Sequence, residues 1–295
     1  MTERELSRLC FGCEPLGGTD WGTVDIAEIG RAIDRALDLG IDFFDTADVY
    51  GLGLSEERLS QALGHRRHDV VIATKGGVSW TRPTSGTRAT VSYDSSPTYI
   101  RTAVHESLRR LRLDVLPIYF VHWPDPRTPT EATFSELEKL RIEGKIRSLG
   151  CSNYSAEQVA RACQAAMVEF IQLPINLLEG ALGPDMMAAC ARHHLRIMAY
   201  NVLAQGLLTG KYDESSRFPE DDRRSRLPQF QGQQYGDALV KVAQVSEKAA
   251  SENLTAAQYA VRWVLRQPQV ASAIVGIKSV KQLDENAVAS GAVVA

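Results

Sequence analysis

The sequence predicts a single α/β domain over residues 1–295, folded as a (β/α)8 TIM barrel. Short apolar segments alternate with amphipathic ones along the whole chain, which is the pattern of parallel βαβ units. There are eight such apolar segments, the number of strands in a closed barrel of this type. The length of 295 residues also suits this barrel, which typically takes about 250 residues.

The predicted strands are rich in valine, isoleucine and phenylalanine, as expected of strands that are covered on both faces. They are residues 9–13, 41–45, 70–75, 117–122, 147–151, 169–173, 196–200 and 271–275. An open nucleotide-binding sheet would instead carry the motif G-x-G-x-x-G after its first strand. Gly12, Gly17 and Gly18 do not have that spacing, so a closed barrel is favoured.

The predicted helices lie between the strands and carry their own start and stop signals. Ile26, Ile29 and Ile33 recur at helical spacing in residues 25–39, and Gly40 follows as a stop. A serine and a first-turn proline at 96–97 open a helix that runs to about residue 111. Capping-box patterns stand at 155–158 and 255–258. The other predicted helices are residues 55–63, 131–143, 184–193, 237–251, 256–266 and 280–290.

Two connections, 76–96 and 202–236, are too long for plain loops between a strand and the next helix. Loops of this length in a compact domain are usually functional or disordered. Each follows the carboxyl end of a predicted strand. We therefore expect both on the catalytic face of the barrel.

The charge balance and the cysteine pattern exclude several other classes of protein. With 33 basic and 36 acidic residues, the chain lacks the basic surplus of a general nucleic-acid binder. It has no apolar run long enough to cross a membrane and no apolar secretory leader, so we expect a cytoplasmic protein. Cys10 and Cys13 are expected to be buried thiols, without a metal, because no second cysteine or histidine pair stands at ligand spacing. The oligomeric state stays open.

Four ionisable groups stand at the carboxyl ends of successive predicted strands. Asp45 ends the second strand with Tyr50 just beyond it, Lys75 ends the third, and His122 ends the fourth. Such a group of ionisable side chains on one rim predicts a site for proton transfer. We expect Lys75 to lower the pKa of the Tyr50 phenol, which would then suit protonation of a carbonyl oxygen beside a histidine. No side chain supplies hydride, so a nicotinamide cofactor is implied.

Several motifs together resemble the aldo-keto reductases, in a bacterial form similar to the potassium-channel β-subunit-like branch. The segment around Asp45 and Tyr50 reads GIDFFDTADVYG, and the segments ending at Lys75 and containing His122 read IATK and YFVHWPD. The stretches IRSLGCSNYS at 146–155 and GLLTGKY at 206–212 also match. The resemblance extends from about residue 9 to residue 290.

The resemblance implies reduction of an aldehyde or ketone with NADPH. Tyr50 would be the general acid, Lys75 and Asp45 would tune it, and His122 would orient the substrate carbonyl. Two alternatives remain: a cofactor-binding regulatory module with little turnover, as in potassium-channel β-subunits, and a lysine-dependent aldolase-type barrel that uses Lys75.

The resemblance also implies the residues that hold the cofactor, from the nicotinamide to the adenosine end. They are Ser152, Asn153 and Gln172 on the carboxamide, Tyr200 on the ring, Leu203, Gly206 and Lys211 on the pyrophosphate, and Gly276, Lys278, Gln282, Glu285 and Asn286 at the adenosine. Independently, Ser279 can cap the helix that follows, and Lys278 and Lys281 add positive charge there. A helix N-terminus with added positive charge favours the 2′-phosphate of NADP over NAD, although Ser279 and Gln282 also fit a plain capping box.

The chain departs from the family pattern at a few positions near the expected site. Glu14 stands where a small or apolar residue is usual, and Asn201-Val202 stands where Ser-Pro or Gly-Ser is commoner. The sequence stops soon after the adenosine segment, from which we expect either a more open substrate pocket or a partner subunit that completes its wall. The residues expected to line that pocket are Trp21, Trp80, Tyr93 and Trp123. The substrate itself could be a keto-sugar, an aromatic ketone or a small aldehyde.

Overall fold

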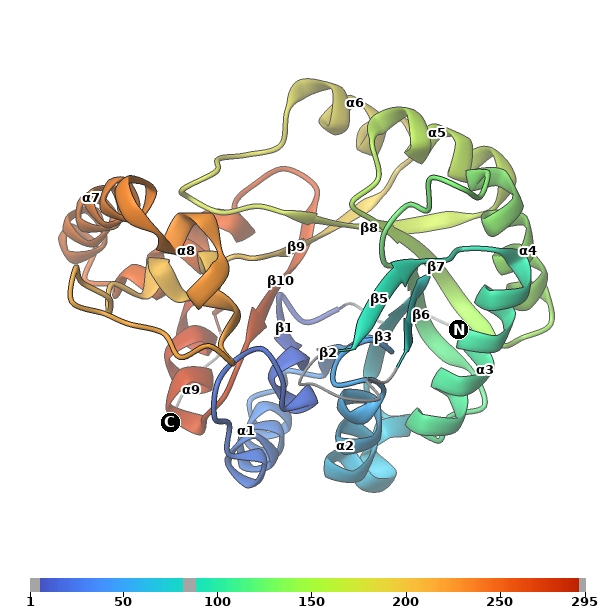
Figure 1. Cartoon of the computed structure of the whole chain (residues 1–295), viewed down its shortest axis with the longest axis horizontal. Helices are drawn as coiled ribbons and strands as arrows, with labels where there is room; N and C mark the ends of the chain where they lie inside the picture. The colour runs from blue at the N-terminus through green and yellow to red at the C-terminus, as the bar shows by residue number, and fades with distance from the viewer. Residues whose placement is uncertain (1–5, 82–88, 292–295) are drawn as a thin grey trace.

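The computed structural model describes residues 6–81 and 89–291, and its centre is a closed barrel of eight parallel strands (Figure 1). The strand order around the barrel is β1-β10-β9-β8-β7-β6-β3-β2. The strands are β1 Leu9–Gly12, β2 Phe43–Asp45, β3 Val71–Gly76, β6 Leu116–Val121, β7 Ile146–Ser152, β8 Val168–Pro174, β9 Arg196–Tyr200 and β10 Val270–Gly276. All eight predicted strands and the (β/α)8 fold class are confirmed.

Helices surround the barrel, and the predicted caps are present. They are α1 Ile26–Asp38, α2 Leu54–Leu63, α3 Pro97–Leu111, α4 Thr130–Ile142, α5 Ala156–Ala165, α6 Pro184–Arg192, α7 Gly232–Ser251, α8 Ala256–Leu265 and α9 Val280–Ala289. Both capping boxes form, with Ser155 and Thr255 accepting from the backbone three residues on. No helix in the described ranges has the length and apolar character needed to cross a membrane.

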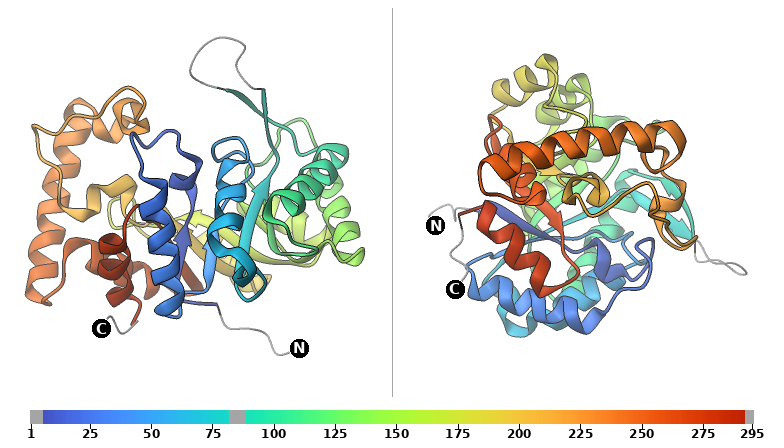
Figure 2. Two further views of the ribbon diagram at one scale, coloured as in Figure 1. Left: turned by 90° about the horizontal axis from the view of Figure 1, so that it is seen from below. Right: turned by 90° about the vertical axis from the view of Figure 1, so that its left-hand side faces the viewer.

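Both long connections contain more regular structure than the sequence indicated. Within 76–96, β4 (Val78–Thr81) and β5 (Thr90–Tyr93) pair as an antiparallel ribbon beside the barrel (Figure 2). Both strands alternate apolar and polar side chains, a period-two signal that is short and easily missed. In 202–236, α7 begins at Gly232 and not at the predicted residue 237, after three short 3-10 helices, η3 Ala204–Thr209, η4 Arg223–Arg226 and η5 Pro228–Phe230.

Alternation along each strand sorts the side chains into two cores. One parity, which includes Phe43, Ala73, Phe120 and Phe170, fills the barrel interior. The other parity, which includes Phe44, Ile72 and Tyr119, packs between the barrel and the helices. Because side chains alternate along a strand, the next interior positions toward the carboxyl ends of β2, β3 and β8 are Asp45, Lys75 and Gln172.

Phe120 fills so much of the interior that the neighbouring strand can carry only glycine beside it. A Cβ added to Gly150 would lie 2.2 Å from Cε1 of Phe120. By contrast, a Cβ on Gly30, in the middle of α1, would meet no atom within 4 Å.

We therefore expect opposite effects from two glycine-to-alanine changes. Gly150→Ala should lower the free energy of unfolding by about 1–3 kcal/mol, because the interior has to shift around the added methyl group. Gly30→Ala should raise it by about 0.5–1 kcal/mol, because alanine is favoured over glycine inside a helix and the added methyl group meets no clash. Urea unfolding of the two variants tests this, and equal effects of the two would contradict the packing assigned to Phe120.

Candidate active site

The four predicted catalytic residues meet at the carboxyl-terminal mouth of the barrel. Asp45 ends β2, Lys75 is the penultimate residue of β3, and His122 directly follows β6. Tyr50 lies on the 46–53 loop between β2 and α2, and its ring contacts that of His122 edge to face at 5.7 Å. The structure thus brings together all four residues that the sequence placed on one rim.

Lys75 is the centre of this group and uses each of its three N–H bonds. Its Nζ donates to Oδ1 of Asp45 at 2.6 Å, to the carbonyl oxygen of Thr46 at 2.8 Å and to the Tyr50 hydroxyl at 3.3 Å. The side chain is only 2% exposed. An ammonium has three donors, so these contacts fix its orientation fully. Burial alone would lower the pKa of Lys75, but Asp45 and Tyr50 outweigh burial and raise it.

The pKa of Tyr50 differs from the sequence-based expectation. Lys75 does act to lower it, as predicted, but burial of the phenol has the larger effect and raises the pKa above its usual value. The negative charges of Glu14 and Asp45 add to that rise. The phenol is therefore protonated at neutral pH and can act as a proton donor.

His122 is held as a neutral imidazole beside the phenol. Burial, and then the charge of Lys75, lower its pKa well below the usual value. Its backbone N–H donates to the carbonyl oxygen of Gly76 at 2.8 Å, which ties the end of β6 to β3. Its Nδ1 is buried and has no hydrogen-bond partner among the described residues. A neutral imidazole can donate one hydrogen bond without competing as an acid at neutral pH.

The four predicted nicotinamide residues form a hydrogen-bonded row along the ends of β7, β8 and β9. The amide of Asn153 donates to the carbonyl oxygen of His122 and to Oγ of Ser152, at 3.1 and 3.0 Å. The Tyr200 hydroxyl donates to Oδ1 of Asn153 at 2.6 Å. Gln172 donates to Oδ2 of Asp45 at 2.6 Å, which the sequence did not indicate. This contact links the row directly to the catalytic group.

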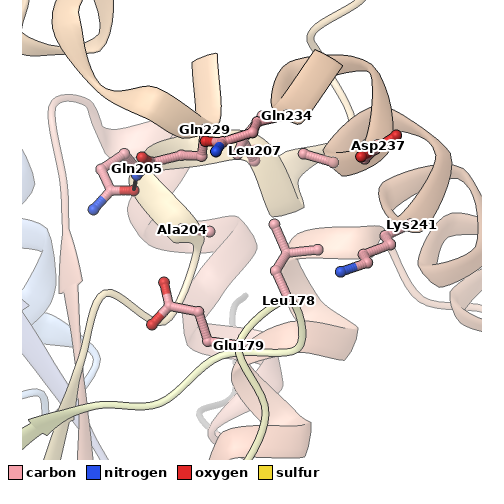
Figure 3. A pocket seen from close by; sticks show the side chains of 10 residues that line it. Leu178, Glu179, Ala204, Gln205, Leu207, Gln229, Gln234, Asp237 and Lys241 are labelled. Carbon is pink, nitrogen blue, oxygen red and sulfur yellow. Dashed lines mark hydrogen bonds between the residues drawn. The ribbon is translucent and has the colours of Figure 1, made fainter. Parts of the chain in front are cut away.

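The predicted pyrophosphate segment has an unusual backbone. Ala204, Gln205 and Gly206 follow Leu203 with φ values of +46°, +51° and +96°. Non-glycine residues in this region are strained, and such strain clusters at ligand-binding loops. The outer side of the segment borders a pocket of about 270 Å³, which Leu178 and Glu179 also line (Figure 3). None of the four predicted catalytic residues lines this pocket, so it lies apart from the candidate active site.

Three cations gather where the adenosine end was expected. Lys211, Arg224 and Lys278 act on one another electrostatically, and the carboxylates of Asp222 and Glu285 oppose them. Burial, and then the charge of Arg224, lower the pKa values of both lysines. Cations that repel one another in a partly buried place suit an anionic ligand, and these residues therefore fit the phosphates of a nucleotide.

The start of α9 adds to this region. Ser279 caps the helix, and the Gln282 side chain accepts from the backbone N–H of Lys278 at 2.9 Å. Gln282 is therefore part of the helix start, in line with the capping alternative. Glu285 accepts through its backbone carbonyl from Gln258 at 3.1 Å. Oδ1 of Asn286 is buried and has no partner among the described residues. Gly276 ends β10 next to this start.

The structure shows the neighbours of the four aromatic residues that are expected to line a substrate pocket. Tyr93 and Trp123 lie together with ring centroids 6.2 Å apart, and both are partly exposed. Trp80 is on β4, the strand that pairs with the one carrying Tyr93. Trp21 lies beside the cations, with the Lys278 ammonium 5.6 Å from the centre of its ring. That the four residues line one pocket stays a prediction.

Arg223 and Glu14 form a contact that sequence reasoning missed. Oε1 of Glu14, on the loop after β1, lies 2.7 Å from Nη1 of Arg223 on η4. The same two loops are joined by the backbone bond from Arg223 to Asp20 and by an ion pair between Arg226 and Asp20. The only sequence signal was the run RRSR within a long loop on the catalytic face. The unusual Glu14 thus has an ionic partner in the described structure.

The comparisons with known proteins agree with this geometry. Residues 8–293 match the model of the Aldo/keto reductase family. Aldo-keto reductase YhdN of Bacillus subtilis is 35% identical over 283 residues, which cover 95% of this chain and 84% of the relative. The NADP(+) aldo-keto reductase yakc of Schizosaccharomyces pombe is 33% identical over 283 residues, which cover 94% of this chain and 81% of the relative.

Two solved structures share the fold over nearly the whole chain. The glycerol dehydrogenase AKR11B4 from Gluconobacter oxydans has a TM-score of 0.87 at 37% identity and covers 98% of this chain and 87% of its own. The holo form of aldo-keto reductase AKR11C1 from Bacillus halodurans has a TM-score of 0.77 at 25% identity. The match covers 98% of this chain and 91% of that structure's chain. With its barrel, its rim of four ionisable residues and these relatives, the chain belongs to the aldo/keto reductase family of oxidoreductases.

Proposed function

We propose that this protein reduces an aldehyde or ketone to an alcohol with NADPH, and that Tyr50 is the general acid. The observation that carries the proposal is the arrangement around Lys75. Its ammonium bonds at once to a buried carboxylate, a backbone carbonyl and the Tyr50 phenol, beside a neutral His122. This arrangement supplies a proton donor with a fixed counter-charge and a second hydrogen-bond donor, which is what reduction of a carbonyl needs.

The residues would share the work as follows. His122 donates a hydrogen bond to the substrate oxygen and orients it. The nicotinamide, when bound, supplies the hydride that the carbonyl carbon accepts. Tyr50 gives its proton to the oxygen, and the Lys75 ammonium at 3.3 Å stabilises the phenolate that remains. Asp45 keeps Lys75 charged and in place at 2.6 Å.

The choice of NADP over NAD rests on the cations at the far end of the site. Lys278 directly precedes the N-cap of α9, and Lys211 and Arg224 act on it electrostatically. One relative carries NADP(+) in its name. A 2′-phosphate would bring two negative charges to this group of cations and relieve their mutual repulsion. Lys211 would in turn reach the pyrophosphate.

Tyr50→Phe should abolish turnover and leave cofactor binding intact. Removing the hydroxyl removes the proton donor, so the rate of carbonyl reduction should fall by at least about 100-fold. The dissociation constant for NADPH should stay within about threefold, because the ring remains. The rate of carbonyl reduction is measured by the oxidation of NADPH, and the dissociation constant for NADPH is measured by fluorescence titration. Tyr259→Phe, which removes a hydroxyl on α8, serves as the control and should keep full activity.

The same experiments test the alternatives. Wild-type turnover by Tyr50→Phe would exclude Tyr50 as the acid. Tight NADPH binding by the unaltered protein without turnover on any carbonyl of a broad panel would favour the regulatory module. A borohydride-trapped substrate adduct on Lys75 would favour the aldolase interpretation.

The raised pKa of Tyr50 predicts the pH dependence of carbonyl reduction. The active form is the protonated phenol, and its pKa is shifted upward. The value of kcat/KM should therefore be level from about pH 6 to about pH 9 and fall only in stronger alkali, as the phenol ionises. A rate that falls with rising pH near neutrality would contradict the protonation state assigned to Tyr50.

Lys278→Met should weaken NADPH more than NADH. The change removes the charge and keeps a side chain of similar length, so the dissociation constant for NADPH should rise by about tenfold or more. That for NADH, which lacks the 2′-phosphate, should change by less than about threefold. Lys248→Met is the matched control, since Lys248 is exposed on α7 and is not among the residues expected to hold the cofactor. Equal loss for both cofactors would place Lys278 elsewhere along the nucleotide.

A further inference from the structure

We call the 46–53 loop between β2 and α2, which carries Tyr50, the catalytic loop. Behind it lies a buried polar cluster that the proposed reaction does not use. It consists of Asp48 on the loop, Glu56 on α2, Arg110 on α3 and Tyr119 on β6, and Ser107 lies about one turn before Arg110 on α3. Tyr119 has the strand parity that faces the helices, so its ring leaves the barrel and reaches this space. All five side chains are at least nine-tenths buried. So many buried polar groups in one place are costly unless they are paired.

The charges in this cluster do not balance if both carboxyl groups are ionised. Nε of Arg110 donates to Oε2 of Glu56 at 2.6 Å, and Thr74 donates to Oε1 of Glu56 at the same distance. Glu56 is thus fully paired. Asp48 interacts with the same guanidinium only electrostatically and forms no hydrogen bond with it. Burial, and then repulsion from Glu56, raise the pKa of Asp48 well above its usual value, against the effects of Arg110 and Lys75.

Five atoms of the cluster have no hydrogen-bond partner among the described residues. They are both carboxyl oxygens of Asp48, Oγ of Ser107, Nη2 of Arg110 and the hydroxyl of Tyr119. The set contains donors as well as acceptors, and electrostatic interactions connect Tyr119 and Arg110 to Asp48. Buried polar groups of this kind are usually joined by ordered water that makes about three hydrogen bonds.

The cluster contacts one end of the catalytic loop and the strand to which the loop is bonded. A Cβ on Gly53, at the end of the loop, would lie 2.9 Å from Cδ of Arg110. A Cβ on Gly76, the residue of β3 after Lys75, would lie 2.0 Å from the Tyr119 hydroxyl. Between the two, the backbone N–H of Asp48 donates to the carbonyl oxygen of Lys75 at 3.1 Å. Arg110 therefore packs against the loop after Tyr50, and Tyr119 packs against β3 next to Lys75.

This loop needs support because its backbone is strained. Gly51, Leu52 and Gly53 follow Tyr50 with φ values of +60°, +56° and +94°. A non-glycine residue such as Leu52 persists in this conformation only when its surroundings hold it there. On one side, Gly51 packs on Gly17, whose carbonyl oxygen would lie 2.3 Å from an added Cβ. Asp48 and its cluster form the other side.

We propose that Asp48 is a positioning residue for Tyr50: its carboxyl group, buried behind the loop beside Arg110 and Tyr119, holds the catalytic loop so that the phenol meets Lys75. The inference rests on the proposed role of Tyr50. The groups that act on Asp48 are Glu56 from α2, Arg110 from α3, Lys75 from β3 and the backbone N–H of Val49, and Asp48 in turn acts on Tyr99 and Tyr119. Glu56 holds the ion pair with Arg110, so Asp48 is the carboxyl group left without a counter-charge of its own. A neutral carboxyl group both donates and accepts, which an ionised one does not.

Three variants test the proposal. Asp48→Ala removes both functions of the carboxyl group, and kcat for carbonyl reduction should fall by about tenfold or more, since small misplacements of a reacting group have large effects on rate. KM and the dissociation constant for NADPH should stay within about threefold, because the binding residues lie on other elements. Asp48→Asn mimics the neutral carboxyl group and should keep kcat within about threefold.

Tyr119→Phe provides a test that does not threaten folding, because it removes one hydroxyl and keeps the ring. We expect a fall in kcat of about threefold or more with unchanged NADPH binding. The matched control is Ser60→Ala on α2. Its buried hydroxyl is fully paired with the carbonyl oxygen of Leu111 at 2.9 Å and lies outside the cluster. This control should keep kcat within about twofold even if it lowers stability.

The outcomes separate this inference from the proposed function. If Asp48→Asn loses as much activity as Asp48→Ala, the carboxyl group is ionised and the inference is wrong. If Tyr119→Phe and both Asp48 variants match the unaltered protein, the cluster does not position Tyr50. Either result, alongside an inactive Tyr50→Phe, leaves the role of Tyr50 intact. An active Tyr50→Phe would instead overturn the proposed function itself.

Discussion

The ammonium of Lys75 is the constraint on which the rest of the site depends. It is almost fully buried and is held by a carboxylate, a backbone carbonyl and a phenol. A charge in that position is tolerated only when every donor is paired, so Asp45 and Tyr50 have little freedom. The closed barrel supplies the geometry, because β2 and β3 are neighbours with Asp45 in register with Ala73, two residues before Lys75.

The two ends of the proposed site differ in their balance of charge. Near the phenol, Lys75 is bound to Asp45. At the start of α9, the three cations Lys211, Arg224 and Lys278 outnumber the two carboxylates that act on them, Asp222 and Glu285. A balanced pair fixes positions, whereas an unbalanced group attracts an anion. That contrast is the physical basis for assigning proton transfer to one end and phosphate binding to the other.

The long connections on the catalytic face differ in how far sequence could predict them. Their position followed from their length and from the strands they follow. The β4–β5 ribbon was missed because each strand is only four residues long, too short for a reliable period. The start of α7 was placed five residues late because Gly232 and the glutamines that follow carry no cap signal. The contact between Glu14 and Arg223 joins residues 209 positions apart, and no local pattern encodes it.

The sequence by itself determined the barrel, its eight strands, the helix caps and the four residues on the rim. These follow from local periodicity and from the rule that carboxyl ends of parallel strands share one face of the barrel. Only the tertiary structure decided the balance of burial and charge. It raised the pKa of Tyr50 where a neighbouring lysine alone predicted a fall, turned Gln172 toward Asp45, and placed Trp21 beside Lys278. Desolvation and long-range pairing depend on which elements pack together, and a linear sequence does not state that directly.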